Sequence, residues 1–326
     1  MTKKRIGLTT TVPHEIIVAA GCVPVDLNNV FISAADRLAW LERAENEGFP
    51  AGICAWIKGI YAAVRAGCVD AVVTVLTGDC TNTRALAEVL RHRGVATIPF
   101  DFPSQPEPAA VRQSLEDLAA RFAVSLQQAE QVRRQWIPLR RNLAELDRLA
   151  DQEGRVGSAE LHQWLVSASD FNGDAERFAA ELGDFLSAVA RRPILPPAVR
   201  LALLGVPPIF ENLFAALEER GARVVFDEVP RQFAMPYDCA DLVEQFCRYT
   251  YPYDSTPRLA DLRREVDRRR IRAALHYLQA FCHRQIEHII IRESLPVPVL
   301  ALEGDRPGPL TGQTLTRLDA FLEMLL

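Results

Sequence analysis

Two cysteines stand at similar places in the chain, each directly after an apolar run that is typical of a β-strand. The run "VDAVVTVLTGDC" ends at Cys80, and "IRAALHYLQAFC" ends at Cys282. A helical pattern follows each of them, so both thiols are expected at a helix N-terminus. The unpaired N–H groups and the positive partial charge found there stabilise a thiolate. Because thiolate is the form of cysteine that binds iron or zinc, both residues are candidate metal ligands.

Cys54 is a third candidate ligand. The stretch "FPAGICAWIKG" places it in the first turn of a predicted helix, after Pro50 and Gly52. Spacing alone also fits a buried, unreactive thiol at any of these positions, because free cysteine is common in protein cores. We assign such a structural role to the other four cysteines, Cys22, Cys68, Cys239 and Cys247.

The histidines around Cys282 do not indicate a zinc site. His283 and His288 are five residues apart on a predicted helix, whereas a helical metal site places its ligands four apart. His276 lies six residues before Cys282. The chain contains no C-x-x-C, so neither a structural zinc site nor a thioredoxin-type redox pair is supported. A nucleophilic pair of Cys282 with His283 is disfavoured, since sequence neighbours face different ways.

Composition and charge narrow the class of protein. The chain has 326 residues, of which 49% are hydrophobic and 24% charged, as in an ordinary globular protein. Its net charge of −5 gives no reason to expect a nucleic-acid partner. The start "MTKKRIGLTTT" is not a signal peptide, and no apolar run approaches the ~18 residues of a membrane span. With an odd number of cysteines, seven, these features predict a cytoplasmic protein without a membrane partner.

Strands and helices alternate in both halves of the chain, which predicts parallel sheets covered by helices. The expected strands are 5–11, 23–27, 69–76, 95–102, 199–206, 222–229, 271–281 and 297–303, and the expected helices among them are 14–21, 53–67, 83–94, 209–221, 283–295 and 315–326. Residues 107–192 show long helical periodicity without a strand, and "PILPP" (193–197) marks its end. We therefore predict an α/β fold with two Rossmann-like or flavodoxin-like lobes, 1–106 and 197–326, and a helical insertion at 107–196 between them.

The two lobes repeat one plan, which indicates a pseudo-duplication. Each opens with a strand, a Val-Pro pair and a helix, and each contains a strand that runs into a cysteine. Asp101 follows Cys80 by 21 residues, and Glu303 follows Cys282 by the same interval. Cys54 precedes Cys80 by 26 residues, and the position 26 before Cys282 is Thr256. The second half thus has a hydroxyl where the first has a thiol.

Ligands of open parallel sheets bind beyond the carboxyl ends of the strands, where Cys80 and Cys282 are expected. Three thiolates from two lobes suit an iron–sulfur cluster, and a missing fourth thiolate would leave one iron open to a substrate oxygen. Thr256, Glu303, Gln313 and Arg317 are candidates to line the cavity beside it. A structural role is the alternative for the last segment, with Thr314 as a cap and Arg317 in a salt bridge.

The chain resembles the 2-hydroxyacyl-CoA dehydratase and benzoyl-CoA reductase family, and the D-component of 2-hydroxyglutaryl-CoA dehydratase in particular. The resemblance spans nearly the whole chain and rests on the order and spacing of several segments. These are "VPHEIIVAAGCVPVDL", "GDCTNT", "HYLQAFCHRQIEH", "VPVLALEGDRPG" and "GQTLTRLDAFLEML".

This resemblance implies a [4Fe–4S] cluster held by Cys54, Cys80 and Cys282, with one open iron. It implies a lyase of anaerobic metabolism that dehydrates or reduces an acyl-CoA thioester by radical chemistry. The implied partners are an ATP-dependent iron–sulfur activator and a homologous subunit in a homo- or heterodimer. Alternatives are a double-cubane [8Fe–9S] reductase of small molecules, an electron-relay accessory protein, and a zinc-binding or metal-free α/β protein. Neither the acyl group nor the general base is predicted.

Overall fold

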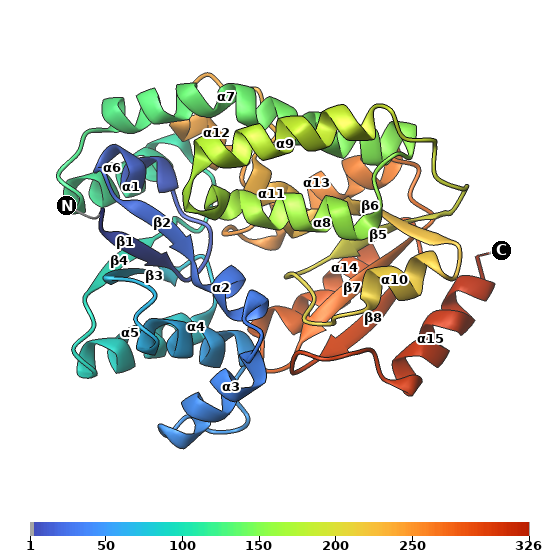
Figure 1. Cartoon of the computed structure of the whole chain (residues 1–326), viewed down its shortest axis with the longest axis horizontal. Helices are drawn as coiled ribbons and strands as arrows, with labels where there is room; N and C mark the ends of the chain where they lie inside the picture. Colours follow the sequence, from blue (N-terminus) through green and yellow to red (C-terminus); the bar gives the residue numbers. More distant parts are fainter. Residues whose placement is uncertain (1–2, 326) are drawn as a thin grey trace. The chain divides into compact units, whose positions relative to one another are not determined.

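The strands of the computed structural model, which describes residues 3–325, form two four-stranded sheets (Figure 1). The first sheet consists of β1 (Arg5–Leu8), β2 (Val23–Asp26), β3 (Ala71–Thr77) and β4 (Thr97–Asp101). The second consists of β5 (Val199–Leu204), β6 (Ala222–Asp227), β7 (Ala273–Gln279) and β8 (Val299–Gly304). Every pair of neighbouring strands in both sheets is parallel, as the alternating pattern predicts.

The two sheets have the same topology, which confirms the predicted pseudo-duplication. Their strand orders are β2-β1-β3-β4 and β6-β5-β7-β8. In each sheet the first strand pairs with the third, as Leu8 with Val73 and Leu203 with Leu275. The acids near the ends of the fourth strands differ in register by one residue. Asp101 is opposite Thr77, the last residue of β3, whereas Glu303 is opposite Leu278, the residue before the last one of β7. A register shift between β3 and β4 accounts for this difference.

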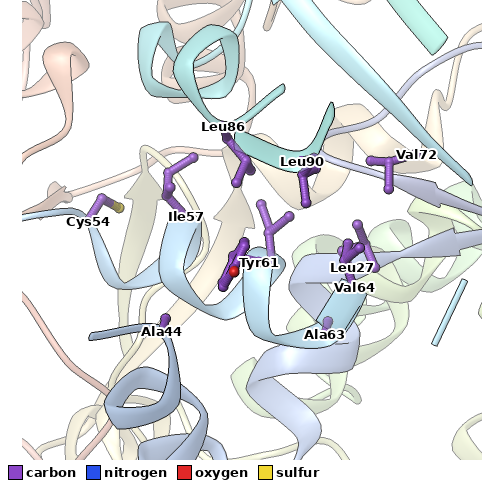
Figure 2. Close-up of a cluster of buried hydrophobic side chains, with 11 residues drawn as sticks. Leu27, Ala44, Cys54, Ile57, Tyr61, Ala63, Val64, Val72, Leu86 and Leu90 are labelled. Atoms are coloured by element: carbon purple, nitrogen blue, oxygen red, sulfur yellow. The ribbon is translucent and has the colours of Figure 1, made fainter. Parts of the chain in front are cut away.

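Helices α4 (Ala55–Arg65) and α5 (Thr81–His92) pack with β3 to form an apolar core (Figure 2). The spacing of their apolar residues explains this, because Ile57, Ile60 and Val64 lie on one face of α4. The first part of the chain also contains α1 (His14–Ala19), α2 (Leu27–Ser33) and α3 (Arg37–Asn46). Residues 28–46, which lie in α2 and α3 and the loop between them, are not among the expected elements.

The second sheet is covered in a corresponding way by α13 (Ser255–Arg268) and α14 (His288–Ser294). Leu262 and Val266 of α13 and Ile291 of α14 pack on Ala202, Phe226 and Ala274 of the strands. The other helices of the second half are α10 (Leu213–Glu218), α11 (Glu228–Ala234), α12 (Leu242–Arg248), the short 3₁₀ helix η4 (His283–Glu287) and α15 (Gly312–Glu323). The final helix was predicted to reach Leu326, a residue outside the described part of the chain.

Residues 108–189, all of which the structure describes, hold helices and no strand, as predicted. They form α6 (Pro108–Arg121), α7 (Leu126–Arg148), the π-helix η1 (Leu149–Glu153), α8 (Ser158–Val166), the 3₁₀ turns η2 (Ser167–Ser169) and η3 (Phe171–Gly173), and α9 (Ala175–Val189).

Contacts divide the chain into two compact units. The first unit is 1–140, 167–178 and 235–254, and the second is 141–166, 179–234 and 255–326. The helical segment is therefore shared between the two units. The boundaries expected from the sequence, after residues 106 and 196, follow the two sheets and remain a prediction as domain limits.

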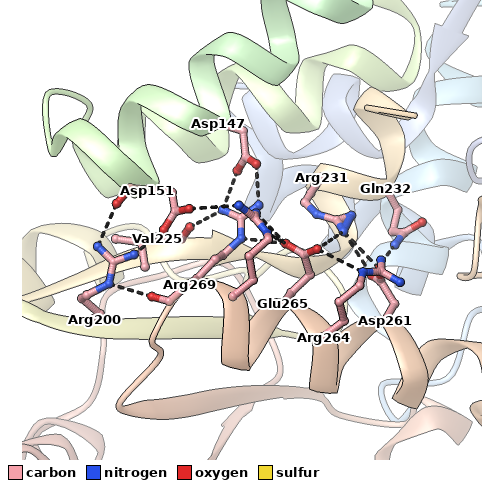
Figure 3. Close-up of polar contacts among 11 residues, drawn as sticks. Asp147, Asp151, Arg200, Val225, Arg231, Gln232, Asp261, Arg264, Glu265 and Arg269 are labelled. Carbon is pink, nitrogen blue, oxygen red and sulfur yellow. Dashed lines mark hydrogen bonds and ion pairs between the residues drawn. The ribbon is translucent and has the colours of Figure 1, made fainter. Parts of the chain in front are cut away.

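The second unit contains a network of ion pairs and hydrogen bonds between charged side chains (Figure 3). Glu265 of α13 and Arg269, the residue after that helix, lie at its centre, and Glu265 Oε2 accepts a hydrogen bond from Arg269 Nε at 2.9 Å. Arg231 lies between Asp261 and Glu265, with nitrogen–oxygen distances of 3.1 and 3.4 Å. Arg231, Asp261, Glu265 and Arg269 are all buried, so these opposite charges replace water for one another.

None of the helices within residues 3–325 combines the length and the apolar character that crossing a membrane requires.

Candidate functional site

The three candidate cysteines occupy the same structural position, the N-cap of a helix. Cys54 caps α4, Cys80 caps α5 and Cys282 caps η4. Their ψ angles are alike, at 130°, 127° and 129°, whereas their φ angles range from −46° at Cys54 to −88° at Cys282. The sequence analysis placed Cys54 inside the first turn of its helix, and the structure places it at the residue before that turn. Each thiol therefore lies where the backbone N–H groups of a helix favour negative charge.

Cys54 and Cys80 belong to the same apolar cluster of the first unit. Cys54 is buried within this cluster, and the half-buried Cys80 packs against it. Figure 2 shows the sulfur of Cys54 at the edge of the cluster, at the start of α4. Leu86 of α5 and Ile57 of α4 fill the space behind the two helix starts. The packing of α4 against α5 thus determines where both thiols lie.

The loop before Cys80 makes a tight turn that depends on glycine. Gly78 has a φ of +90°, and a Cβ there would lie 2.7 Å from Cβ of Phe102 and 3.0 Å from the carbonyl oxygen of Pro252. The hydroxyl of Tyr251 donates to Asp79 Oδ1 over 3.4 Å. The segment around Tyr251 and Pro252 therefore packs against the residues that lead from β3 to Cys80.

The loop before Cys282 has the same length as the loop before Cys80. Each cysteine follows the last residue of its strand, Thr77 or Gln279, by three positions. Gln279 is buried: its Nε2 donates to the carbonyl oxygen of Asp305 at 2.8 Å, and its Oε1 accepts from the hydroxyl of Tyr277 at 2.6 Å. Phe281 adopts a φ of +62°, and its side chain is 52% exposed. An exposed aromatic residue in this left-handed conformation indicates a turn whose shape is imposed by its surroundings.

The remaining cysteines lie in different surroundings. Burial raises the pKa of Cys239 to about 11, and burial together with Asp241 and Glu244 raises the pKa of Cys247. Both thiols therefore favour the protonated form. Cys22 donates a weak hydrogen bond to the carbonyl oxygen of Ala20 at 3.8 Å. These observations agree with a structural role.

The histidines near Cys282 contact each other. Nδ1 of His276, in β7, lies 3.0 Å from Nδ1 of His288, and their rings stack with centroids 5.3 Å apart. Burial and the nearby Arg258 lower the pKa of His276 to about 3, so this imidazole is neutral at physiological pH. Within residues 3–325, no group of three or more His, Cys, Asp and Glu side chains lies close enough together to hold a metal ion.

The other four candidate residues lie near strand ends and helix starts of the second unit. Thr256 is exposed in the first turn of α13, one residue after its start and so two residues past the cap position that Cys54 occupies in α4. Glu303 is exposed near the carboxyl end of β8, beside the end of β7. Gln313 and Arg317 are exposed on α15.

The structural alternative considered for α15 was wrong in detail. The cap of this helix is Thr311, whose hydroxyl accepts from the backbone N–H of Thr314 at 3.2 Å. Arg317 donates to the carbonyl oxygen of Ala301 in β8 at 2.9 Å, and the expected salt bridge is not found among residues 3–325.

The residues that hold the cysteine loops are not among the predicted site residues. Tyr251 and Pro252 are far from Cys80 along the chain, and Arg258 is far from Glu287, which it contacts in the second unit. A cluster of aromatic residues, "YTYPYD" (249–254), was the available signal for the first pair. No local pattern indicates the second pair, because an Arg–Glu contact across 29 residues leaves no periodic trace.

Comparisons with known proteins give one extensive match. A family model described as 2-hydroxyglutaryl-CoA dehydratase, D-component, matches residues 9–325. A search of curated proteins found no match.

Two solved structures of the SBP FpvC from Pseudomonas aeruginosa, in complex with Mn²⁺ and with Ni²⁺, are each 16% identical to this chain. The matches cover 99% of this chain and 98% and 97% of those chains, with TM-scores of 0.24 and 0.25. Scores this low carry no argument about this chain.

Proposed function

Because this chain belongs to the 2-hydroxyglutaryl-CoA dehydratase D-component family, we propose that it is a cluster-carrying subunit of an enzyme that dehydrates a 2-hydroxyacyl-CoA thioester. The proposed ligands of a [4Fe–4S] cluster are Cys54, Cys80 and Cys282. The net reaction removes water from the substrate and leaves an enoyl-CoA, without net oxidation or reduction. The proposed partners are a homologous subunit and an ATP-hydrolysing iron–sulfur activator.

The observation that carries this proposal is the shared position of the three cysteines. All three are N-caps with similar ψ angles, in a chain whose two sheets repeat one topology. A thiol at a helix N-terminus is stabilised as a thiolate, and iron–sulfur clusters are held by thiolates. Cys239 and Cys247, whose pKa values are raised, lack this property. The chemistry of the donor set therefore fits the cluster.

When bound, the cluster would supply a low-potential electron and an iron that takes the thioester oxygen. The chain itself would hold the cluster and shield it from water. The apolar cluster behind Cys54 and Cys80 excludes water from one side of both thiols. Removing water strengthens electrostatic interactions in a site and suppresses side reactions of reactive intermediates.

A position without a thiolate is part of the proposal. Thr256 lies in the first turn of α13, the helix that corresponds to α4, and it offers a neutral hydroxyl two residues past the position that corresponds to the thiol of Cys54. A neutral hydroxyl is a weak ligand for iron in comparison with a thiolate. We assign Glu303, Gln313 and Arg317 to contacts with the bound substrate, on the basis of their place beside the carboxyl end of β8 and on α15.

Iron and acid-labile sulfide analysis of anaerobically purified protein tests the proposal. The wild-type chain is expected to hold about four irons, and Cys54→Ala, Cys80→Ala and Cys282→Ala are each expected to lose most of them. Cys22→Ala and Cys68→Ala are the matched controls and should retain the iron. Full iron content in Cys282→Ala would refute the ligand assignment. A titration with acyl-CoA then separates an enzyme subunit, which binds it, from a simple electron carrier.

A further inference from the structure

The helix that carries Cys282 cannot hold its position by itself. η4 contains five residues, and none of them is buried. Short 3₁₀ helices have poor hydrogen-bond geometry, and a single turn costs more conformational entropy than its hydrogen bonds return. Nearby apolar side chains give little support, since Phe281 is 52% exposed and Ile286 is 74% exposed. The place of the thiol must therefore depend on contacts from outside η4.

Glu287, the last residue of η4, makes such a contact. Its Oε2 accepts a hydrogen bond from Arg258 Nη1 at 2.5 Å. The side chain of Arg258 is 5% exposed and that of Glu287 is 24% exposed, so water screens this ion pair only partly. Arg284 Nη1 also donates to Glu287 at 3.1 Å, but Arg284 belongs to η4 itself. η4 continues directly into α14, whose Ile291 is buried in the core, and the contact with Arg258 ties the junction of these two helices to α13.

Arg258 is in turn held in place by a buried carboxylate. Glu228, the residue after β6, accepts from Arg258 Nε at 2.5 Å and from Nη2 at 2.8 Å. The second oxygen of Glu228 also accepts the backbone N–H of Gly205, the residue after β5, at 2.8 Å. A two-point contact of this kind fixes the plane of the guanidinium group. Arg258 is therefore held at the carboxyl ends of two adjacent strands, β6 and β5, and reaches Glu287 from there.

The charges in this chain of contacts favour its ionised form. Burial by itself would raise the pKa of Glu228, but Arg258 and the N–H group of Gly205 outweigh it and hold that pKa below its ordinary value. The guanidinium group of Arg258 thus forms ion pairs with two carboxylates, those of Glu228 and Glu287, and Glu287 forms a second ion pair with Arg284. Hydrogen bonds between charged partners are stronger than neutral ones, so the contact with Glu287 is a strong one.

We propose that the ion pair between Arg258 and Glu287 positions Cys282 as a cluster ligand. This inference rests on the proposed function, and it assigns both residues as positioning residues rather than catalytic ones. Holding Glu287 fixes the end of η4, and a helix of five residues transmits that constraint to its N-cap. Without this contact, the Cys282 thiol is still present, but its position is no longer fixed and it can move away from the iron.

Hydrogen exchange of the metal-free protein tests the mechanical half of the proposal. The variant is Glu287→Gln, which keeps the shape of the side chain and removes its charge. The control is Glu293→Gln, which removes a charge from the exposed surface of α14. In Glu287→Gln, the amides of Gln285 in η4 and of His288, the residue after it, are expected to exchange about fivefold faster than in wild type. Unchanged exchange in Glu287→Gln would overturn the proposal.

Iron release from the cluster-loaded protein tests the other half. With a chelator present, Glu287→Gln is expected to lose iron about fivefold faster than wild type, and Glu293→Gln at the wild-type rate. Iron loss at the wild-type rate in Glu287→Gln, together with faster exchange, would show that the ion pair holds η4 without positioning a ligand, and so would refute the proposal. A wild-type chain that binds no iron would refute the proposed function itself, and the exchange experiment would still show whether the ion pair holds η4.

Discussion

Arg269 Nη1 donates a hydrogen bond to Asp147 Oδ1 at 2.9 Å, and this contact joins the end of α13 to the end of α7 within the second unit. The side chain of Arg269 is 1% exposed and that of Asp147 is 12% exposed. The same guanidinium group donates to the carbonyl oxygen of Val225 in β6 at 2.6 Å. Figure 3 shows these three elements meeting at Arg269. The buried Arg269 cation is thus stabilised by several acceptors, and removing any one of them should lower the stability of the protein.

Replacing Asp147 by alanine should strongly destabilise the protein. The change leaves the Arg269 cation buried with one acidic partner fewer, and breaking a buried ion pair from one side costs about 3–5 kcal/mol. Urea unfolding followed by circular dichroism measures the change in the free energy of unfolding. The control is Glu145→Ala, in the same last turns of α7, where an exposed pair with Arg148 is lost at a cost of under about 1 kcal/mol. Equal losses in the two variants would contradict the structural role of Asp147.

Replacing Gly78 by alanine should disturb the loop that leads to Cys80. The φ of +90° is unfavourable for alanine, and the new Cβ would meet Phe102 at 2.7 Å and the backbone of Pro252 at 3.0 Å. Since backbone atoms cannot move aside easily, the loop itself must shift. The expected result is a lower iron content, measured after anaerobic reconstitution, together with a lower melting temperature.

Gly94→Ala separates backbone strain from steric contact in this test. Gly94 has a φ of +77°, but a Cβ added there would have no other atom within 4 Å. This variant should lose about 1–2 kcal/mol of stability from the left-handed conformation alone and keep its iron. If Gly94→Ala lost as much iron as Gly78→Ala, the contacts with Phe102 and Pro252 would not explain the result.

The stability of the protein should depend on pH through Asp170. Burial and the neighbouring Asp26 raise the pKa of Asp170 from 3.8 to about 7, so the folded state binds a proton that the unfolded state has released. The stabilisation is complete below pH ~3.8 and is lost as the pH rises to about 7, with a slope of about 1.4 kcal/mol per pH unit between them. The free energy of unfolding, measured by urea titration at several pH values, should therefore fall over this range.

Asp170→Asn provides the comparison for this pH dependence. Asparagine cannot titrate, and its one amide oxygen can replace only one of the two carboxyl oxygens that accept from the backbone N–H groups of Asp26 and Asn172. The fall in stability between about pH 4 and pH 7 should be smaller in this variant by about 1.4 kcal/mol per pH unit. Glu176→Gln, an exposed change in α9, should retain the wild-type slope. A wild-type slope in Asp170→Asn would show that another group is responsible.

Thr256→Cys tests the position that is proposed to lack a thiolate. With suitable geometry, a fourth thiolate would keep the iron content and abolish ligand exchange and turnover, because the open iron would be occupied. Electron paramagnetic resonance with and without added acyl-CoA measures the exchange. Thr256→Ser is the control, since it preserves the hydroxyl. Spectra of Thr256→Cys that still respond to acyl-CoA as in wild type would exclude Thr256 from this position.

The sequence by itself determined the alternation of elements and the repeat of the plan in two halves. Apolar runs such as 69–76 and 271–281 are local signals, and their ends coincide with those of β3 and β7 to within two residues. The equal intervals after Cys80 and Cys282 reflect loops of equal length, which the two sheets reproduce. These features follow from patterns of neighbouring residues, because periodicity and turn chemistry act over short distances along the chain.

Only the tertiary structure decided what holds each thiol loop. Tyr251 contacts Asp79 from 172 positions away in the sequence, and Pro252 packs with it against the turn before Cys80. Arg258 and Glu228, both remote from η4 in the sequence, determine where Glu287 lies. Contacts of this kind depend on which strand ends and helices fold next to one another, and one charged residue looks like any other until that packing is known. The sequence therefore indicated the candidate ligands, and the fold decided which side chains position them.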